Sequence, residues 1–540
     1  MPLSRRRFLK VVGVTAGAVT VSEVLGQPLW MVQRLEAAPL APAALRALAD
    51  AALDRARKLG CSYADIRINR YRNQTVGLRT SPDRSAGTAS GKVNHVPTVI
   101  ETESFGFGVR VLHSGTWGFA ASPRVEKDEI ARITQDAVTI ARANAALTQR
   151  PVTLAPVPSY QDRYATPFEK NPFDVPVQEK LALLQAVNDS AKKVQGVMTV
   201  NSGLVFRSED KFFASTEGSV LEQLIVQTVP SMSATAVDFA TRKSKSRSFQ
   251  VHPVSGGYEH VDRCGMLQEA ERVGSEAVEH LRSPSVAPGV KDLVLLPSHL
   301  SLTIHESVGH STELDRALGY EANYAGTSFV APPEKMLGNL RFGSELVNVI
   351  GDRTLPQGMS TVGYDDDGVK ATSFHIIEGG IFKAYQTTRE QAHWVGEKES
   401  RGCCYADSFD SIPFQRMPNV WLEAGKDGKS LDDLIAMVDD GILIDGRGSY
   451  SIDQQRYNFQ FGGDAFWEIK NGKKGRMLAD VAYQSKTADF WNSCSAIAEQ
   501  RYWVNFGLTN DGKGQPSQVN AMSHGCAPSL FRQINVLRTE

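Results

Sequence analysis

The chain has 540 residues, of which 41% are hydrophobic and 22% are charged, an ordinary balance for globular proteins. Its 59 basic and 60 acidic residues give a formal net charge of -1, so we do not expect a surface that binds nucleic acid. The length exceeds the size at which a single hydrophobic core stops growing, which predicts two domains.

The N-terminus has the composition of an export signal. Residues 4–10 (SRRRFLK) place a twin arginine before Phe-Leu-Lys, and a weakly apolar stretch follows at residues 11–21. This order is typical of a twin-arginine signal, here residues 1–38, with a weakly defined cleavage site at Ala37 and Ala38. We therefore expect export to the periplasm or the cell exterior. An uncleaved anchor and a chance basic patch are the alternatives.

The remainder of the first half alternates between helical and strand-like patterns. Apolar residues recur at helical spacing in segments that we expect to be helices: residues 43–59, 127–145, 178–193 and 267–281. Strand-like patterns and turn residues predict the following: strands at 63–71 and 104–112, a loop at 81–94, a turn at 115–119, and strands between 197 and 233. The Pro-rich stretch 151–176 should cross the surface. These segments form a predicted N-terminal domain, residues 43–283.

A linker, residues 283–289 (SPSVAPG), separates this domain from a second one. Beyond it, residues 291–296 predict a buried strand, and Pro297 and Ser298 predict the start and the cap of a helix. From residue 346 onward, short strands and Gly/Asp turns dominate. We expect an α+β fold with a mixed N-terminal domain and a strand-rich C-terminal domain, residues 290–540, that carries this helix. Past the N-terminus no apolar run is long enough to span a bilayer, so the mature chain should be soluble.

The cysteines form no C-x-x-C pair, so neither a zinc knuckle nor a thioredoxin-type motif is predicted. We expect most of them to be buried small side chains without disulfides. They are Cys61, Cys264, Cys403, Cys404, Cys494 and Cys526.

The segment HESVGH, residues 305–310, has the composition of a hydrolytic metal site. The imidazoles of His305 and His310 can hold a divalent ion, and Glu306 can take a proton from water activated by the metal. The familiar zinc-peptidase spacing is H-E-x-x-H, and this segment has one residue more. At about 100° per residue, positions i and i+5 diverge on an α-helix. The helix must form a local π-bulge or end near Gly309, whose backbone freedom permits either.

Residues 305–315 (HESVGHSTELD) closely resemble the TldD/PmbA family, in its TldD-type metalloprotease branch. The resemblance extends from about residue 43 to the end of the chain. Further blocks that agree are YADIR (63–67), GFGVRV (106–111), WGF (117–119), DDDG (365–368), GKGQP (512–516), SHG (523–525) and FR (531–532).

This resemblance implies a zinc peptidase with His305 and His310 as ligands and Glu306 as general base. It implies hydrolysis of peptides or unfolded polypeptides in an enclosed site, by a homodimer or by a heterodimer with a paralogue that lacks the motif. Glu313 matches a family position and would orient a ligand from outside the ligand set. A solvated helix carboxylate is the alternative for Glu313.

One position departs from the family pattern. A cysteine usually precedes the Gly-Lys-Gly-Gln block and resembles the third metal ligand, whereas this chain has Asp511 there. A carboxylate can complete a two-histidine zinc site, and it shifts preference toward harder ions such as Mn or Fe(II). Asn-Asp-Gly also favours turns, so Asp511 could be a turn residue instead. His524, which could alternatively bind substrate or a strand-end carbonyl, and Cys526, more often a packed small residue, are the other nearby candidates.

Three other functions compete with an active peptidase. A non-catalytic or regulatory subunit of a TldD/PmbA-type complex would explain Asp511, but the intact His305, Glu306 and His310 argue against decay of the site. A dipeptidyl peptidase III-like enzyme also uses H-E-x-x-G-H, yet the second glutamate-bearing motif that it needs is not evident. An exported redox enzyme lacks support, because no nucleotide fingerprint, haem motif or cysteine cluster is present.

Overall fold

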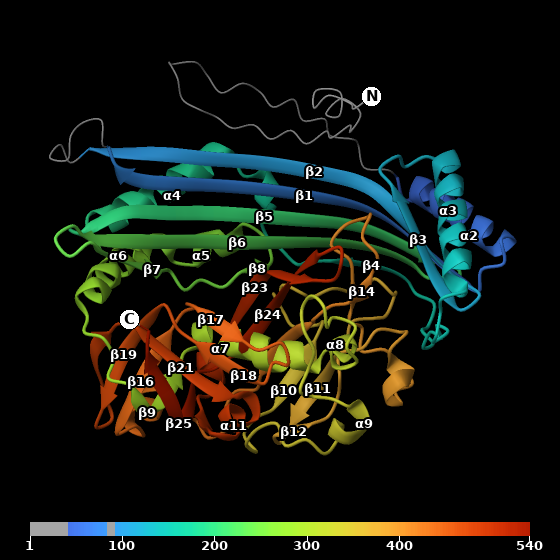
Figure 1. Ribbon diagram of the computed structural model, residues 1–540. Coiled ribbons are helices and arrows are strands. Elements are labelled where there is room, and N and C mark those ends of the chain that lie inside the picture. The colour runs from blue at the N-terminus through green and yellow to red at the C-terminus, as the bar shows by residue number, and fades with distance from the viewer. Residues whose placement is uncertain (1–40, 84–91, 540) are drawn as a thin grey trace, which may run out of the picture.

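The computed structural model describes residues 41–83 and 92–539. The twin-arginine segment at residues 1–38 lies outside the described residues. A long curved sheet from the N-terminal half lies over a second body that is built by the C-terminal half (Figure 1). No helix within the described ranges is long and apolar enough to cross a membrane.

Eight strands of the described residues form the N-terminal sheet, in the order β3-β2-β1-β5-β6-β4, with β7 and β8 also paired to β6. The strands are β1 (Tyr63–Pro82), β2 (Val93–His113), β3 (Thr116–Ser122), β4 (Gln161–Ala165), β5 (Val197–Ser215), β6 (Val220–Asp238), β7 (Lys243–Ser248) and β8 (Val254–Ser255). The antiparallel hairpin of β1 and β2 runs without a break from Tyr63 opposite Leu112 to Pro82 opposite Val93. The sheet is therefore long enough to extend over the whole C-terminal half.

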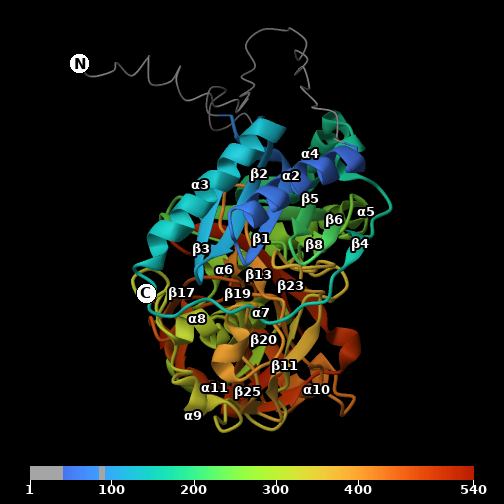
Figure 2. The same cartoon turned by 90° about the vertical axis from the view of Figure 1, so that its right-hand side faces the viewer.

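Helices cover one face of this sheet, and the C-terminal half lies against the other (Figure 2). The helices of this half are α2 (Pro42–Lys58), α3 (Lys127–Ala145), α4 (Val177–Lys192), α5 (Glu259–Arg263) and α6 (Met266–Arg282). Because side chains alternate along a strand, Ile66 and Ile68 of β1 are buried under helices, while Asp65 and Arg67 face the other way. The Arg67 guanidinium donates to the Ser411 carbonyl at 2.6 Å, which ties the two halves together.

The C-terminal half contains a nine-stranded sheet and a four-stranded sheet among its described residues. The larger sheet comprises β9 (Gly289–Leu295), β16 (Asp440–Asp445), β17 (Tyr450–Ile452), β18 (Asn458–Phe461), β19 (Ala465–Lys470), β20 (Lys473–Leu478), β21 (Val481–Lys486), β22 (Cys494–Ile497) and β25 (Ser529–Arg538). The smaller one comprises β10 (Val349–Asp352), β11 (Ser373–Glu378), β12 (Ile381–Phe382) and β15 (Asn419–Leu422). Two hairpins are β13 (Cys404–Tyr405) with β14 (Phe414–Gln415), and β23 (Val504–Lys513) with β24 (Gln518–Cys526).

Short helices connect these strands: α7 (Pro297–Thr303), α8 (Leu314–Ala317), α9 (Pro333–Met336), α10 (Leu431–Ala436) and α11 (Thr487–Asn492). One large apolar core lies between them, and it includes Leu293 and Leu295 of β9 and Leu300 of α7. The buried strand β9 thus leads directly into α7, which continues into the residues of the HESVGH segment. The α+β class is confirmed.

The loop predicted at residues 81–94 and the turn predicted at residues 115–119 are both shorter than expected. Residues 81–82 and 93–94 belong to β1 and β2 rather than to a loop, and residues 116–119 belong to β3, so that the turn is confined to Ser114 and Gly115. The Pro-rich crossing also contains the short strand β4. Most residues of β2 from 93 to 104 are exposed, so this part of the strand carries no alternation of apolar and polar residues. All six cysteines are free, in agreement with the prediction.

Candidate metal centre

The helix that carries His305 changes type as it proceeds. It begins as α7, continues as a π-helical turn over Ile304–Gly309, and ends as a 3-10 turn over His310–Thr312. Pro297 occupies its first turn, where a missing N–H costs nothing, as expected. The prediction of a Ser298 cap is wrong. Leu296 is the N-cap, and the Ser298 hydroxyl instead donates to Asp445 while accepting the Gly446 N–H at 2.9 Å.

The π-helical turn resolves the unusual spacing of the two histidines. The His310 N–H donates to the His305 carbonyl, which is an i to i+5 hydrogen bond and brings the two rings together edge to face. The two ring centroids are 4.4 Å apart. Gly309 has ordinary right-handed torsion angles, so its backbone freedom is not what permits the turn. A Cβ at Gly309 would lie 2.6 Å from Met417 Sδ, and glycine is therefore needed for this close approach.

Side chains hold the carbonyl groups around this turn. Hydroxyl groups one turn further along the helix, and one amide from outside it, donate to these carbonyls and satisfy acceptors that an altered helix leaves open. The pairs are Ser307 to Thr303 O at 2.5 Å, Ser311 to Ser307 O at 2.7 Å, Thr312 to Val308 O at 2.8 Å, and Gln386 Nε2 to Gly309 O at 2.6 Å. The geometry that aligns the histidines is thus held by hydroxyl groups of neighbouring residues and by Gln386 from a distant segment.

Three potential ligand atoms converge at this turn. Asp511 Oδ1 lies 3.7 Å from His305 Nε2 and 3.4 Å from His310 Nε2. One ligand atom from each of the three residues lies within 4.8 Å of the other two, and all three residues are buried. Among the described residues, no other group of three or more His, Cys, Asp or Glu side chains lies close enough together to hold a metal ion.

His524 fixes the orientation of the His305 ring. His524 Nδ1 is 2.9 Å from the Val420 carbonyl, which can only accept, so this nitrogen carries the proton. Its Nε2 then accepts from His305 Nδ1 at 2.9 Å, which leaves the lone pair of His305 on Nε2. Burial lowers the pKa of His524 to about 3 and holds the pKa of His305 well below its ordinary value, with repulsion from His310 adding to the effect at His305. Both rings are therefore neutral at pH 7, the form that can bind a metal.

Glu313 performs the equivalent task for His310. Its Oε2 lies 3.1 Å from His310 Nδ1 and accepts from that nitrogen, so His310 Nε2 is left to face Asp511. Arg316 Nη2 approaches the same Nδ1 at 3.2 Å, and Arg316 Nε donates to Glu313 Oε2 at 2.9 Å. Although burial opposes ionisation, Lys513 and Arg316 hold the pKa of Glu313 well below its usual range. The carboxylate is fully buried, so the interpretation of Glu313 as a solvated helix residue is wrong.

Asp511 lies within a strand rather than a turn. It belongs to β23 and pairs with Asn520 of β24, next to a register shift between Leu508 and Asp511. The chain turns later, at Gly514, whose φ is +87°. The turn interpretation of Asp511 is therefore wrong. Although burial opposes ionisation, His310, His305 and Arg416 hold the pKa of Asp511 well below its usual range, and Arg416 Nη2 lies 3.1 Å from Asp511 Oδ2.

Glu306 lies outside the group of three ligand atoms, on the same π-helical turn. Its Oε2 accepts from Arg456 Nη1 at 2.5 Å, and Arg456 Nη2 also donates to the Ala325 carbonyl at 3.3 Å. Arg456 has a left-handed backbone with φ of +61°, a conformation that non-glycine residues adopt rarely. The Asp453 carboxylate holds this loop by accepting the Tyr457 N–H at 2.8 Å.

The structure thus brings together His305, His310 and Asp511, with Glu313 and His524 directly behind them. Cys526 is buried among apolar residues and its thiol approaches the Pro297 carbonyl at 3.7 Å, as expected of a packed small residue. Sequence reasoning missed the cations around the site. Lys513 donates to Glu313 Oε1 at 3.2 Å and to Asp315 at 2.9 Å; it lies in the GKGQP block, whereas no local pattern marks Arg416 or Arg456.

Comparison with known proteins agrees with this geometry. Family models match three segments: PmbA/TldA metallopeptidase domain 1 at residues 94–141, the central domain at 170–283, and the C-terminal domain at 288–536. A metalloprotease of Methanocaldococcus jannaschii is 27% identical over 442 residues, which cover 81% of this chain and 90% of the relative. A Saccharolobus solfataricus protein named zinc metalloprotease TldD homolog is 23% identical over 489 residues, which cover 87% of this chain and 95% of the relative.

A solved structure shares the fold. TldE from Thermococcus kodakarensis superposes with a TM-score of 0.67 at 14% sequence identity, over 91% of this chain and 99% of the other. At that identity the likeness concerns the fold alone. The matched domains follow one another in family order across most of the chain and include the two histidines. The chain therefore belongs to the TldD/PmbA family.

Proposed function

We propose that this chain is a metal-dependent peptidase that hydrolyses peptides or unfolded polypeptides. The observation that carries the proposal is the convergence of His305 Nε2, His310 Nε2 and Asp511 Oδ1 within 4.8 Å of one another. Each imidazole has its other nitrogen engaged, by His524 and by Glu313, so both lone pairs face the same point. Relatives named metalloproteases support the same chemistry.

The donor set fits a divalent ion. Two neutral imidazoles and one carboxylate are an established set for catalytic zinc, and they leave room for water or substrate. The name of the Saccharolobus relative favours zinc, while the carboxylate at Asp511 also suits Mn or Fe(II). When bound, such an ion lowers the pKa of water and polarises a carbonyl group.

Glu306 is the proposed general base. Arg456 engages Oε2, which leaves Oε1 of the same carboxylate to take a proton from the attacking water and to pass it to the leaving amine. Arg456 thus holds the carboxylate in one orientation. The hydrogen bonds of His524 and Glu313 keep the two imidazole rings from rotating. Arg316 and Lys513 donate to the buried Glu313 carboxylate and keep it ionised.

Location and assembly follow as further proposals from the sequence. The twin arginine at Arg5 and Arg6 supports export to the periplasm or the cell exterior. The family resemblance supports a dimer, either of two copies of this chain or with a paralogue that lacks the HESVGH segment. The same resemblance supports unfolded or flexible peptides as the substrates of an enclosed site.

The test is metal analysis of the purified chain beside cleavage assays on peptides and on an unfolded protein. We expect one bound ion per chain, loss of cleavage when a chelator removes it, and recovery when zinc, Mn or Fe(II) is added back. A chain that binds one ion but cleaves nothing would support a regulatory subunit instead. A chain that binds none contradicts the proposed ligand set.

A further inference from the structure

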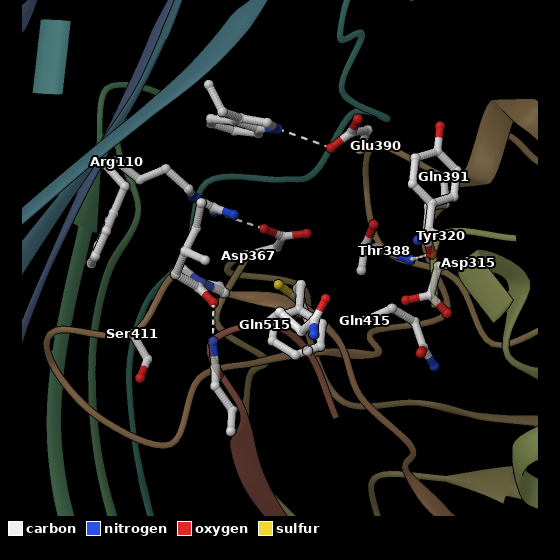
Figure 3. Close-up of a pocket in the computed structure, with 18 of the residues that line it drawn as sticks. Arg110, Asp315, Tyr320, Asp367, Thr388, Glu390, Gln391, Ser411, Gln415 and Gln515 are labelled. Atoms are coloured by element: carbon white, nitrogen blue, oxygen red, sulfur yellow. Dashed lines mark hydrogen bonds and ion pairs between the residues drawn. The ribbon is translucent and has the colours of Figure 1, made fainter. Parts of the chain in front are cut away.

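A cavity of about 540 Å³ lies between the N-terminal sheet and the C-terminal half (Figure 3). Its walls come from β2 and β3, from residues 388–394, from residues 410–415, and from the turn that joins β23 to β24. Ligand pockets in proteins typically enclose about 300–1,000 Å³, so the cavity is large enough for a side chain of a bound peptide. The chemistry proposed for the metal centre does not use it.

The cavity adjoins the candidate metal centre through Lys513. Asp315 and Gln415 line the cavity, and the Lys513 ammonium donates to the side chains of both. The same ammonium donates to Glu313, which holds His310. The β23–β24 hairpin also contributes to both places, since Asp511 precedes the turn whose residues 514–516 line the cavity. A peptide at the metal centre therefore lies near this cavity.

The lining is rich in carboxylates whose charge is unbalanced. The acidic lining residues are Asp315, Glu321, Asp367, Glu390 and Asp410, and Arg110 is the one Lys or Arg among the described residues that line the cavity. Arg110 is already engaged, because its guanidinium contacts Asp65 at 2.7 Å and Asp367 at 2.7 Å. Lys513 pairs with Asp315 at 2.9 Å. The remaining three acids form no ion pair with a cation of the described residues.

Neutral groups are the partners of these three carboxylates within the described chain. Glu390 accepts from Trp117 Nε1 at 2.9 Å, Glu321 accepts from the Gly514 N–H at 3.3 Å, and Asp410 accepts from a serine hydroxyl at 2.5 Å. Burial raises the pKa values of Glu390 and Glu321, although cations that form no ion pair with them, such as Arg110 near Glu390 and Lys513 near Glu321, partly oppose the effect. A cation from a ligand in the cavity would pair with these carboxylates directly.

Aromatic rings and one unsatisfied amide complete the lining. Tyr320 and Trp394 stack with ring centroids 5.9 Å apart, and Trp117 lies beside Glu390, to which its indole N–H donates. Gln518 is only 3% exposed; its Nε2 donates to the Ile412 carbonyl at 2.7 Å, whereas its Oε1 accepts no hydrogen bond from any described residue. A buried acceptor without a donor is costly, so it favours a ligand that brings an N–H group.

We propose that this cavity binds the cationic group of a peptide substrate. The ammonium or guanidinium of a lysine or arginine side chain, or a free α-amine, would be received by Glu390, Glu321 and Asp410, with its apolar stem along the aromatic rings. The inference rests on the proposed function, because that function supplies a peptide as the ligand. It adds a preference for basic peptides over neutral ones.

The first arm measures binding without cleavage. Fluorescent peptides are titrated into the zinc-loaded full-length chain carrying Glu306→Gln. The three peptides are identical except at the central residue and the N-terminus. The first has a central lysine and an acetylated N-terminus, the second has norleucine in place of the lysine and an acetylated N-terminus, and the third has norleucine and a free α-amine. Charge-assisted hydrogen bonds predict that the lysine peptide binds about 10- to 100-fold more tightly than its acetylated norleucine match. Tight binding of the third peptide would assign the cavity to the α-amine, and equal affinity for all three would overturn the proposal.

The second arm uses variants of the cavity in the same background. Glu390→Gln and Asp410→Asn should each reduce the advantage of the cationic peptide, and their thermal unfolding should match that of the parent. Glu378→Gln, an exposed carboxylate on β11, is the matched control and should leave the advantage unchanged. If the lysine peptide still binds as much more tightly than the neutral peptide in both cavity variants, this cavity does not bind the cation.

The two proposals fail in different ways. If the wild-type chain cleaves no peptide but the binding preference for a cation persists, the peptidase is wrong and the cavity stands. If the chain cleaves basic and neutral peptides with equal kcat/KM and binds them equally, the cavity assignment alone is wrong.

Discussion

Asp511 has two roles that one substitution removes together. Its Oδ1 faces the two histidines, and its Oδ2 accepts from Arg416 at 3.1 Å, while the Arg416 side chain is 0% exposed. Asp511→Ala therefore leaves a buried guanidinium without its carboxylate, which costs about 3–5 kcal/mol of unfolding free energy even without metal. It also removes one of three proposed ligands. Metal affinity should then fall by more than the roughly 10- to 100-fold seen when groups behind a ligand are changed.

A second substitution separates the two roles. The double variant Asp511→Ala with Arg416→Met should regain most of the unfolding free energy, because no buried charge is left unpaired, but it should not regain metal affinity. Asp511→Cys should keep metal and raise the preference for zinc over Mn, since thiolates favour softer ions. Denaturant unfolding of the chelator-treated chain measures the first quantity, and zinc titration against a competing chelator measures the second. If Asp511→Ala keeps wild-type affinity, or if the double variant regains it, Asp511 is not a ligand.

Three further predictions concern other residues. Glu313→Gln should weaken metal binding about 10- to 100-fold because His310 loses its carboxylate partner, and unchanged affinity in a zinc titration would contradict this role. Burial lowers the pKa of His299 to about 4, below its ordinary value of 6.5. The unfolded chain therefore binds the proton first as pH falls from about 6.5 to about 4, and the free energy of unfolding drops by about 1.4 kcal/mol per pH unit through this group. His299→Gln should flatten that decline in denaturant unfolding, whereas an identical pH slope would exclude His299 as a source. Replacing Arg5 and Arg6 with lysine should keep the tagged chain in the cytoplasm, and normal export on cell fractionation would show that the signal was misinterpreted.

Helices were predictable because their patterns are local. Apolar residues at helical spacing placed α3 at Lys127–Ala145 with the observed bounds, and α6 within one residue at each end. The long strands were not predictable in the same way. Much of β2 is exposed, so solvent imposes no alternation on its sequence, and the strand is held by its continuous pairing with β1.

The residues of the site were also predictable only where the pattern is local. His305, Glu306 and His310 lie in one short segment, and their spacing alone predicted either a π-bulge or a helix end near Gly309, of which the structure has the π-helical turn. Asp511 was reached through the family resemblance, since it comes from a distant hairpin. The position of Asp511 in a strand could not be predicted, because the sequence Asn-Asp-Gly by itself favours a turn. In the fold, pairing with β24 overrides that preference.

The cations around the site could not be predicted from local patterns. Arg416 and Arg456 reach the site from segments far from the histidines in sequence, and only the fold brings them to Asp511 and Glu306. Arg456 also adopts a left-handed backbone that an arginine rarely takes, so local preference argues against its position.

The most direct test of the central claim is the metal content and peptidase activity of Glu306→Gln, measured side by side with His305→Ala and His310→Ala. Glu306 is proposed to move a proton and not to hold the ion, so Glu306→Gln should retain one metal per chain while kcat falls by about 10²- to 10⁴-fold. The two histidine variants should lose the metal and the activity together. Full metal content in both histidine variants, or wild-type kcat in Glu306→Gln, would contradict the account.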